Sequence, residues 1–433
     1  MTTAIYWFRN DLRLHDNQSL LQACEDSDTL TFVHILADDE TKLTRWGFPR
    51  SGPFRRAFRD MAADGLASAL AAKGAKLVRA KGAPVAVLTR LAEQVGATRI
   101  YCETIPAPQE RAEIAALVSA GLEVRTTWQS TLIDPQDLPF AIKALPEVFT
   151  AFRQAVEGAN VTPRPPLCAP AVLPPAPPEA RSARLRHVVS IQAKPPASAA
   201  FPFGDPNFHG SETGALAHVA RYFRSKAPAD YKATRNGLMG TAYSTKLSPW
   251  LAVGALSPRT VFSALRAHEA IYGASDGSYW IWFELLWRDY FRFWSEKHGV
   301  KVFRAEGLSK LGPPVIDAQA FETWRRAATG EPFVDAGLRE LAATGYLSNR
   351  LRQVVASYLV HDLAGDWRAG AAWFESQLID YDVCSNQGNW LYIAGRGADP
   401  RQGRRFNPSQ QAAHYDPDGR YRALWAEPAD LSP

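Results

Sequence analysis

The chain has 433 residues, 46% of them hydrophobic, a length that fits two domains rather than one and provides material for a sizeable core. Its net charge of +5 is modest, and eleven of its 13 tryptophans lie at or beyond Trp128. No run reaches the roughly 18 uninterrupted apolar residues of a membrane span, and no basic region precedes the first apolar segment as in a secretory signal. The nine histidines lack metal-ligand spacing and the four cysteines form no C-x-x-C pair. We therefore expect a cytoplasmic monomer with no membrane anchor and no bound metal.

Residues 3 to about 128 alternate between short apolar runs and helical patterns. Strands are predicted at 4–8, 30–36, 75–79, 98–102 and 123–128, and helices at 54–73, 85–95 and 109–120. Strands that alternate with helices favour a parallel sheet covered on both faces, which predicts a doubly wound α/β domain over residues 1–130. No G-x-G-x-x-G follows the first strand, so this domain is not expected to bind a pyrophosphate on a glycine loop.

Proline is dense between residues 131 and 206, where the periodicity fades. Because proline fixes φ and removes a donor, we predict a semi-rigid, extended interdomain connector over 131–206. Helical patterns then follow at 214–224, 249–253, 258–270, 279–298, 318–328, 335–344, 349–364 and 370–378. Ser248-Pro249 and Ser257-Pro258 have the N-cap and N1 arrangement that starts helices. Residues 207–433 are thus predicted to form an all-helical domain.

Two features of the helical part suggest binding but have ordinary alternatives. The stretch Asp380–Tyr392, D-Y-D-V-C-S-N-Q-G-N-W-L-Y, has two carboxylates two residues apart beside an amide and aromatic rings. Taken alone, it fits a solvated loop as well as a binding site. Basic residues also cluster, and they could either decorate a solvated face or follow a phosphate backbone. These clusters are Arg221, Arg224, Lys226, Lys232 and Arg235, and Arg396, Arg401, Arg404 and Arg405.

Several stretches, in order, resemble the photolyase and cryptochrome family. They are Tyr6–Asn17, Thr241–Trp250, Phe283–Phe291, Thr344–Gln353 and Asp380–Tyr392. Finer details are similar to the DASH branch, namely Tyr231–Gly237, Ser244–Trp250, Leu378–Asn386 and Tyr415–Tyr421. The resemblance runs from the first strand to about Trp425. It implies a Rossmann-like antenna domain followed by a helical domain that binds FAD and DNA.

The resemblance implies two chromophores. The FAD ligands would be Tyr231, Ser244, Thr245, Lys246, Leu247, Ser248, Arg352, Asp380, Asp382 and Asn386. The hydroxyls, the lysine and helix N-terminal donors suit a pyrophosphate, and Arg352 would pair with the buried Asp380. Asn386 would face flavin N5, where a neutral amide favours reduced FAD. The antenna 5,10-methenyltetrahydrofolate would bind at Gln109, Glu110 and Glu103.

The family's catalytic and electron-transfer positions also have counterparts. By resemblance, the catalytic residues would be Glu284, Trp287, Asn349 and Asn386, and electrons would reach FAD through Trp367 and Trp390. The position of the third tryptophan of the family holds Pro314, so either Trp324 or a tyrosine acts as the surface donor or photoreduction is inefficient. The DNA-binding residues would be Arg235, Glu284, Trp287, Arg288, Asn349, Arg350, Gln353, Tyr392, Arg404, Arg405 and Gln411.

The function that the resemblance implies is that of a deoxyribodipyrimidine photo-lyase. Excited FADH⁻ would donate an electron to a cyclobutane pyrimidine dimer held beside it in DNA. Duplex-active members carry a tryptophan where this chain has Tyr392, so single-stranded DNA is the expected substrate, because it spares the cost of extruding the dimer from a duplex. Asn349 and Gln353 stand where (6-4) repair enzymes have histidines, which disfavours that repair. Two alternatives stay open: a blue-light photoreceptor that binds nucleic acid or a protein partner without repair, and a flavin-containing nucleic-acid binder with no light function.

Overall fold

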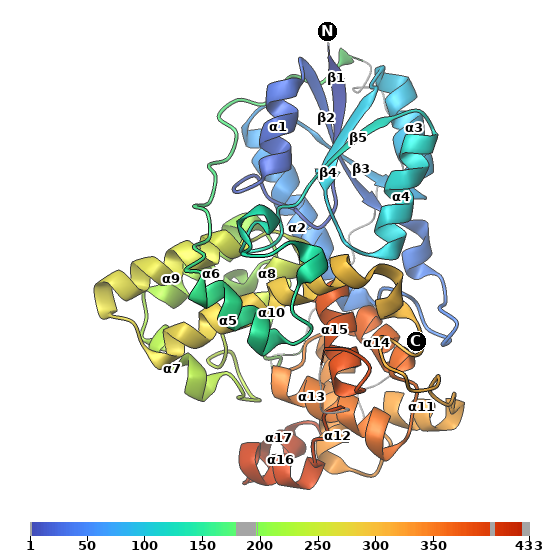
Figure 1. Cartoon of the computed structure of the whole chain (residues 1–433), viewed down its shortest axis with the longest axis vertical. Helices are drawn as coiled ribbons and strands as arrows, with labels where there is room; N and C mark the ends of the chain where they lie inside the picture. The colour runs from blue at the N-terminus through green and yellow to red at the C-terminus, as the bar shows by residue number, and fades with distance from the viewer. Residues whose placement is uncertain (1, 179–195, 197, 399–402, 427–433) are drawn as a thin grey trace.

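The computed structural model describes residues 2–178, 196, 198–398 and 403–426. An α/β domain lies above a larger helical domain (Figure 1). The sheet of the α/β domain has five parallel strands in the order β3-β2-β1-β4-β5, as a doubly wound domain requires. The strands are β1 (Thr3–Phe8), β2 (Thr29–Leu36), β3 (Leu77–Lys81), β4 (Arg99–Glu103) and β5 (Glu123–Thr127). The predicted fold class is confirmed, with β3 starting two residues later than expected.

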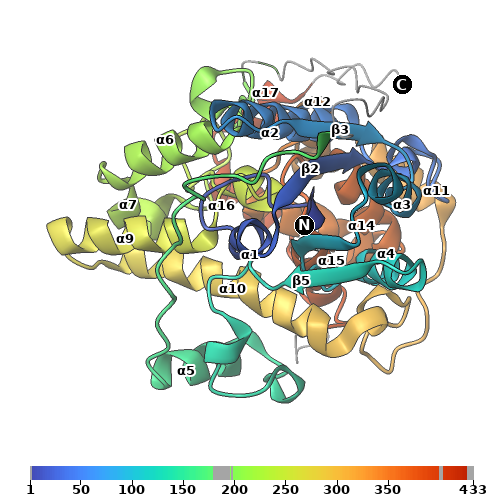
Figure 2. The ribbon, with the colours of Figure 1, turned by 90° about the horizontal axis from the view of Figure 1, so that it is seen from above.

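Helices cover both faces of this sheet because its strands alternate their buried side chains. Ile5 and Trp7 of β1 pack in one core with α3 (Pro84–Val95) and α4 (Pro108–Ser119). Tyr6 and Phe8 belong to the other core, with α1 (Gln18–Asp26) and α2 (Pro53–Ala72). In Figure 2, seen from above, α3 and α4 lie together on one side of the sheet and α1 lies on the other. Helix α1 was not predicted, although Asn17 caps it by accepting the N–H of Leu20 at 3.1 Å.

The carboxyl edge of the sheet rests on the helical domain. The N–H of Leu12, just beyond β1, donates to the carbonyl of Val253 at 3.3 Å. Gly254 has a left-handed φ of +72°, and a Cβ there would lie 1.8 Å from the carbonyl oxygen of Asn10. Only glycine permits both this conformation and this approach. The two domains are therefore held together here by direct contacts between their backbones.

The helical domain contains the predicted helices and several more. Its helices are α6 (Glu212–Phe223), α7 (Ala227–Thr234), α8 (Ser248–Val253), α9 (Pro258–Tyr272), α10 (Asp276–His298), α11 (Ala318–Arg325), α12 (Pro332–Thr344), α13 (Asn349–Ser357), α14 (Trp367–Gln377), α15 (Val383–Ile393), α16 (Pro408–Tyr415) and α17 (Arg420–Leu424). Ser257 caps α9 with Pro258 at the first position, as expected. Ser248 is instead the first residue of α8 and caps nothing with its side chain. None of the described helices is long and apolar enough to cross a membrane.

The connector is less extended than predicted. Helix α5 (Phe149–Gly158) forms within 131–206 and buries Phe149, Phe152 and Val156 beside α10. The end of the connector also joins the core, because Phe201 and Phe203 are buried. An extended conformation was therefore the wrong prediction for residues 149–158, where apolar spacing outweighs the surrounding prolines. Of the residues named above, Arg401 lies outside the described part of the chain.

Candidate functional site

A cavity of about 480 Å³ opens in the helical domain, a volume typical of small-molecule sites. A smaller cavity of about 90 Å³ adjoins it and shares several lining residues. Helices α7, α10, α13 and α15 and the loop before α8 form the walls. Most of the predicted flavin and lesion residues line one or both cavities: Tyr231, Arg235, Ser244, Thr245, Leu247, Ser248, Glu284, Trp287, Arg288, Asn349, Arg352, Gln353, Asp380, Asp382, Asn386, Trp390 and Tyr392. Residues far apart in the sequence are thus brought to one site.

Two ion pairs hold the buried acids of the Asp380–Tyr392 stretch. Arg352 donates through Nη2 to Asp380 Oδ2 at 2.9 Å, the expected pairing. Asp382 is paired with Arg292 of α10 at 2.5 Å, and it also caps α15 by accepting the N–H of Ser385. Burial alone would raise the pKa of Asp382, but Arg292 and Arg288 outweigh it and hold that pKa below its usual value. The sequence reasoning missed Arg292, whose signal was a charged residue within a helix of large aromatic side chains.

The loop before α8 has a strained backbone. Ser244 and Lys246 have left-handed φ values of 62° and 58°, which are unfavourable for residues with a Cβ. Such strain clusters at ligand sites, and here Ser244, Thr245, Leu247 and Ser248 line the cavity. Lys246 does not line it. Its ammonium is buried 3.1 Å from the centroid of the Tyr243 ring. In this conformation Lys246 is therefore not positioned for the expected direct contact with a phosphate.

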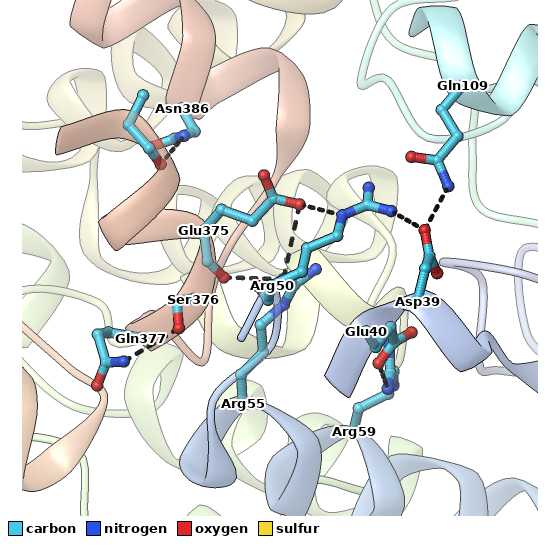
Figure 3. Close-up of polar contacts among 11 residues, drawn as sticks. Asp39, Glu40, Arg50, Arg55, Arg59, Gln109, Glu375, Ser376, Gln377 and Asn386 are labelled. Carbon is cyan, nitrogen blue, oxygen red and sulfur yellow. Dashed lines mark hydrogen bonds and ion pairs between the residues drawn. The ribbon is translucent and has the colours of Figure 1, made fainter. Parts of the chain in front are cut away.

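Unpaired polar atoms in these walls test whether a flavin nucleotide fits. Asp380 Oδ1, Gln353 Oε1 and the Tyr243 hydroxyl belong to lining residues and are buried without a hydrogen-bond partner. Asn386 donates its Nδ2 to the carbonyl of Ala371 at 3.0 Å, which leaves its Oδ1 to accept from a ligand (Figure 3). Buried polar groups are almost always satisfied, so this set predicts a ligand with several donors and acceptors. A flavin ring with a phosphate-bearing tail has that character.

Trp390 lines the smaller cavity and belongs to an aromatic cluster. Its ring lies 5.1 Å from that of Phe374 and 6.3 Å from that of Trp324. Trp324 is fully buried and donates its N–H to the carbonyl of Val355, so it is a neighbour of Trp390 and not a surface donor. Trp367 is buried at the start of α14 and donates to the carbonyl of Ala305. The hypothesis that Trp324 acts as the surface electron donor in place of the missing third tryptophan was therefore wrong.

Gly370→Ala is expected to disturb Trp390 directly. A Cβ at Gly370 would lie 2.2 Å from Trp390 Cη2, so the indole or α14 has to move. Overpacking of this kind costs about 1–3 kcal/mol of stability, measured as the free energy of unfolding in urea. Gly158→Ala is the control, because no atom lies within 4 Å of a Cβ there. An equal effect of the two substitutions would contradict tight packing of α14 on Trp390.

Helix α10 supplies the outer wall of the larger cavity. Glu284 forms an ion pair with Arg235, whose guanidinium lies over the Trp280 ring at 4.6 Å. Burial raises the pKa of Glu284, although Arg235 opposes the shift. Trp287 stacks on Phe149 of α5 with centroids 3.8 Å apart and meets the edge of Tyr392 at 5.8 Å. A carboxylate and a rigid aromatic face thus stand side by side at the mouth of the cavity.

Comparisons with known proteins identify the family. Residues 4–171 match the family model described as DNA photolyase, and residues 280–429 match the FAD binding domain of DNA photolyase. The chain is 42% identical to "Cryptochrome DASH" of Synechocystis over 98% of its own length and 87% of that protein, and 41% identical to the Xenopus laevis "Cryptochrome DASH" over 96% and 81%. This chain is a DASH cryptochrome of the photolyase and cryptochrome family. It is also similar to two solved structures, a Synechocystis cryptochrome (41% identity, TM-score 0.88, covering 98% and 88% of the two chains) and a class III photolyase from Agrobacterium tumefaciens (28%, 0.75, 98% and 86%).

Several residues expected to contact DNA in this DASH cryptochrome differ in how far the protein itself engages them. Arg404 lies over the ring of the cavity-lining Tyr392 at 5.1 Å, and Arg350 lies over the rings of Phe406 and Tyr415. Arg405 is exposed and pairs with Asp362 at 2.6 Å, and the buried Gln411 Oε1 has no hydrogen-bond partner. Arg288 points inward to the backbone carbonyls of Ser130 and Leu251, and burial lowers its pKa to about 10. Arg288 is thus engaged within the protein although it also lines the larger cavity, and its contact with DNA stays a prediction.

The expected antenna residues of the DASH cryptochrome lie in different surroundings. Gln109, in the first turn of α4, donates to Asp39 at 3.4 Å; Asp39 accepts from Arg50, and Arg50 donates to Glu375 of α14 at 2.8 Å (Figure 3). This chain bridges the two domains, and Glu110 follows Gln109 in the same turn. Glu103 is fully buried, and its oxygens accept from the Asn10 N–H and the Ser130 hydroxyl. The structure therefore places Gln109 and Glu110 at the domain seam but leaves Glu103 unable to serve as an accessible ligand.

Proposed function

We propose that this DASH cryptochrome repairs cyclobutane pyrimidine dimers with blue light, preferentially in single-stranded DNA. The residues proposed to hold the lesion, Glu284, Trp287, Asn349 and Gln353, line the same cavity as residues of the FAD-binding domain that suit a flavin. This observation carries the proposal. A pyrimidine dimer held against the first set would lie beside a cofactor held by the second. Bound FAD in its reduced state supplies the electron when it is excited.

The protein's part is to position the lesion and to stabilise charge on it. Glu284 accepts hydrogen bonds from the edges of the pyrimidines, and Trp287 provides a stacking face that Phe149 keeps rigid. Asn349 and Gln353 add neutral donors and acceptors on α13. Arg404, beside the cavity-lining Tyr392, and Arg350, next to Asn349 on α13, attract the phosphates on either side of the flipped dimer. The Gln109 and Glu110 turn at the domain seam supports 5,10-methenyltetrahydrofolate as the second chromophore.

Tyr392 supports the preference for single strands. Its ring is the second aromatic wall of the mouth, at the edge of Trp287. A tyrosine offers less stacking area than a tryptophan, and base–aromatic stacking is worth about 1–3 kcal/mol per base. Extruding a dimer from a duplex costs a few kcal/mol that a single strand largely avoids. The smaller stacking area of Tyr392 should therefore reduce repair mainly in duplex DNA, where stacking has to offset the cost of extruding the dimer.

The test is photorepair by the purified, FAD-loaded and reduced protein on an oligonucleotide with a single dimer. Single-stranded and duplex forms are compared in the light and in the dark. We expect light-dependent repair that is much faster on the single strand. Absence of repair on both forms, with reduced FAD bound, would contradict the proposal and favour the photoreceptor alternative.

Tyr392→Trp is expected to narrow the gap between the two substrates. Added stacking should raise repair of the duplex about tenfold while changing single-strand repair little. Tyr279→Trp is the matched control, because Tyr279 lies on α10 but lines neither cavity. Equal gains on both substrates would point to general DNA affinity and not to compensation for extrusion.

A further inference from the structure

The carboxyl end of helix α14 is capped by residues of the α/β domain. The last carbonyls of a helix have no partner within the helix itself. Here the Glu375 carbonyl accepts from Arg55 Nη1 at 2.8 Å (Figure 3), and the Ser376 carbonyl accepts from the Gly52 N–H at 2.7 Å. A Cβ at Gly52 would lie 2.8 Å from the Ser376 oxygen, so a side chain there would force the two segments apart. The start of α2 is therefore docked on the end of α14.

Ion pairing strengthens this contact between the domains. Arg50 donates through Nε to Glu375 Oε1 at 2.8 Å, and Arg55 Nη1 lies 4.0 Å from the same oxygen. Arg55 Nη1 also donates to the Arg50 carbonyl at 3.4 Å. Cations near the carboxyl end of a helix are favoured by the helix dipole. Both guanidinium groups are therefore well suited to hold the end of α14 in place.

The residues that follow α14 form a wall of the smaller cavity. Leu378, Asp380, Tyr381 and Asp382 all line it. The Arg55 guanidinium lies over the Tyr381 ring at 4.3 Å, a geometry in which the face of the ring attracts the cation. Arg55 thus contacts both the end of α14 and a cavity-lining aromatic ring, although it lines neither of the two cavities itself.

Tyr381 stands between the two acids of the site. Asp380 is paired with Arg352 and Asp382 with Arg292, so an ion pair anchors the chain on each side of Tyr381. The Tyr381 ring is held instead from the other domain. One oxygen of Asp380 is buried without a hydrogen-bond partner, which leaves it to a ligand. A shift of the Tyr381 ring would therefore disturb the cavity wall next to that oxygen.

Helix α14 also holds the amide of Asn386. Asn386 Nδ2 donates to the Ala371 carbonyl at 3.0 Å, and Ala371 lies one turn before Glu375 on α14 (Figure 3). The contact with the α/β domain and the amide in the cavity wall are thus attached to the same helix.

We propose that Arg55 is a positioning residue of the flavin site, supplied by the α/β domain. Its guanidinium holds the Tyr381 ring against the smaller cavity and caps α14, so that the walls that receive FAD keep their places. The α/β domain thereby completes the FAD site. This proposal rests on FAD binding and not on repair, so it is tested in the dark without DNA and its failure would leave the repair proposal standing.

The experiment follows FAD in the loaded full-length protein in two ways. Recovery of flavin fluorescence after dilution gives the rate of FAD release, and visible circular dichroism of bound FAD reports the asymmetry of the wall around the ring. Arg55→Met loses both contacts and should release FAD about tenfold faster. Arg55→Gln keeps an amide donor for the Glu375 carbonyl but loses the cation over Tyr381, so it should release FAD about threefold faster. Both variants should alter the circular dichroism.

Arg59→Met is the matched control. Arg59 lies one turn after Arg55 on α2, and the two side chains are 14% and 19% exposed. Arg59 pairs with Glu40 of its own domain. Its loss should lower the melting temperature about as much as Arg55→Met does, but it should leave FAD release and the circular dichroism unchanged.

A double variant tests whether Arg55 acts through the ring. Tyr381→Leu should itself speed FAD release, and adding Arg55→Gln to it should then change the rate little. Effects that add in the double variant would overturn the proposal. Unchanged release in both Arg55 variants would overturn it too, as would equally fast release from Arg59→Met. Arg55→Gln is the milder change, so it decides the question even if Arg55→Met does not fold.

Discussion

Arg292→Met is expected to lower the free energy of unfolding by about 3–5 kcal/mol at neutral pH, because it leaves a buried carboxylate without its partner. Arg292 and Asp382 are 3% and 8% exposed at their side chains and lie 2.5 Å apart. Asp382 also starts α15, which carries Asn386 and Trp390 into the cavity wall. The change is measured by urea denaturation at a fixed FAD concentration, because FAD binding itself adds to the stability.

The pH dependence of this deficit follows from the sign of the Asp382 shift. With Arg292 present, the pKa of Asp382 is below its usual value, so the pair stabilises the fold above pH about 4 and is lost only as the pH falls through that lowered pKa. Without Arg292, burial raises this pKa, and protonation relieves the unpaired charge. The deficit should therefore be largest at neutral pH and shrink on acidification. Arg292→Met/Asp382→Asn should recover most of the loss, and a double variant as unstable as Arg292→Met would contradict a charge-based cause.

The sheet could be predicted from the sequence because its strands are continuous apolar runs separated by helical patterns. The missed elements had weaker signals. Helix α1 is short, and its main sign was Asn17 at the capping position. Helix α15 was hidden because Asp380–Tyr392 has two acids, two asparagines and a glycine, a composition typical of a loop. Its helix depends on tertiary contacts: Gly388 packs so closely that a Cβ would lie 2.0 Å from Phe291 of α10.

The residues of the site could be predicted from the sequence, but the directions of their side chains could not. The resemblance selected Asp380, Glu284 and Asn386, and the fold brings them to the walls of adjoining cavities. Side-chain direction depends on packing that the sequence does not show. Lys246 was expected to meet a phosphate, yet its ammonium lies against aromatic rings. Arg288 was expected to contact DNA, and although it lines the larger cavity, its guanidinium donates to backbone carbonyls of the protein. Their partners come from segments that no local pattern links to them.

Glu284→Ala is expected to slow photorepair by about ten- to a hundredfold while FAD stays bound. The carboxylate is the only acidic side chain lining the larger cavity on α10, among the described residues, and charge-assisted hydrogen bonds are worth about 1.5–3 kcal/mol. Its removal also leaves the Arg235 guanidinium without its ion-pair partner at the mouth. The measurement is repair per absorbed photon at saturating single-stranded substrate, so that weaker DNA binding does not enter the result.

Two further variants separate a role in repair from a role in folding. Glu284→Gln keeps the shape and one acceptor oxygen but loses the charge, so its repair should lie between that of the wild type and that of Glu284→Ala. Glu296→Ala removes a glutamate from the same helix and breaks its pair with Arg111, far along α10 from the cavity. That control should repair as the wild type does. Unaltered repair in Glu284→Ala would contradict the placement of the lesion against α10, because no other acid on α10 could accept the hydrogen bonds that the proposal assigns to Glu284.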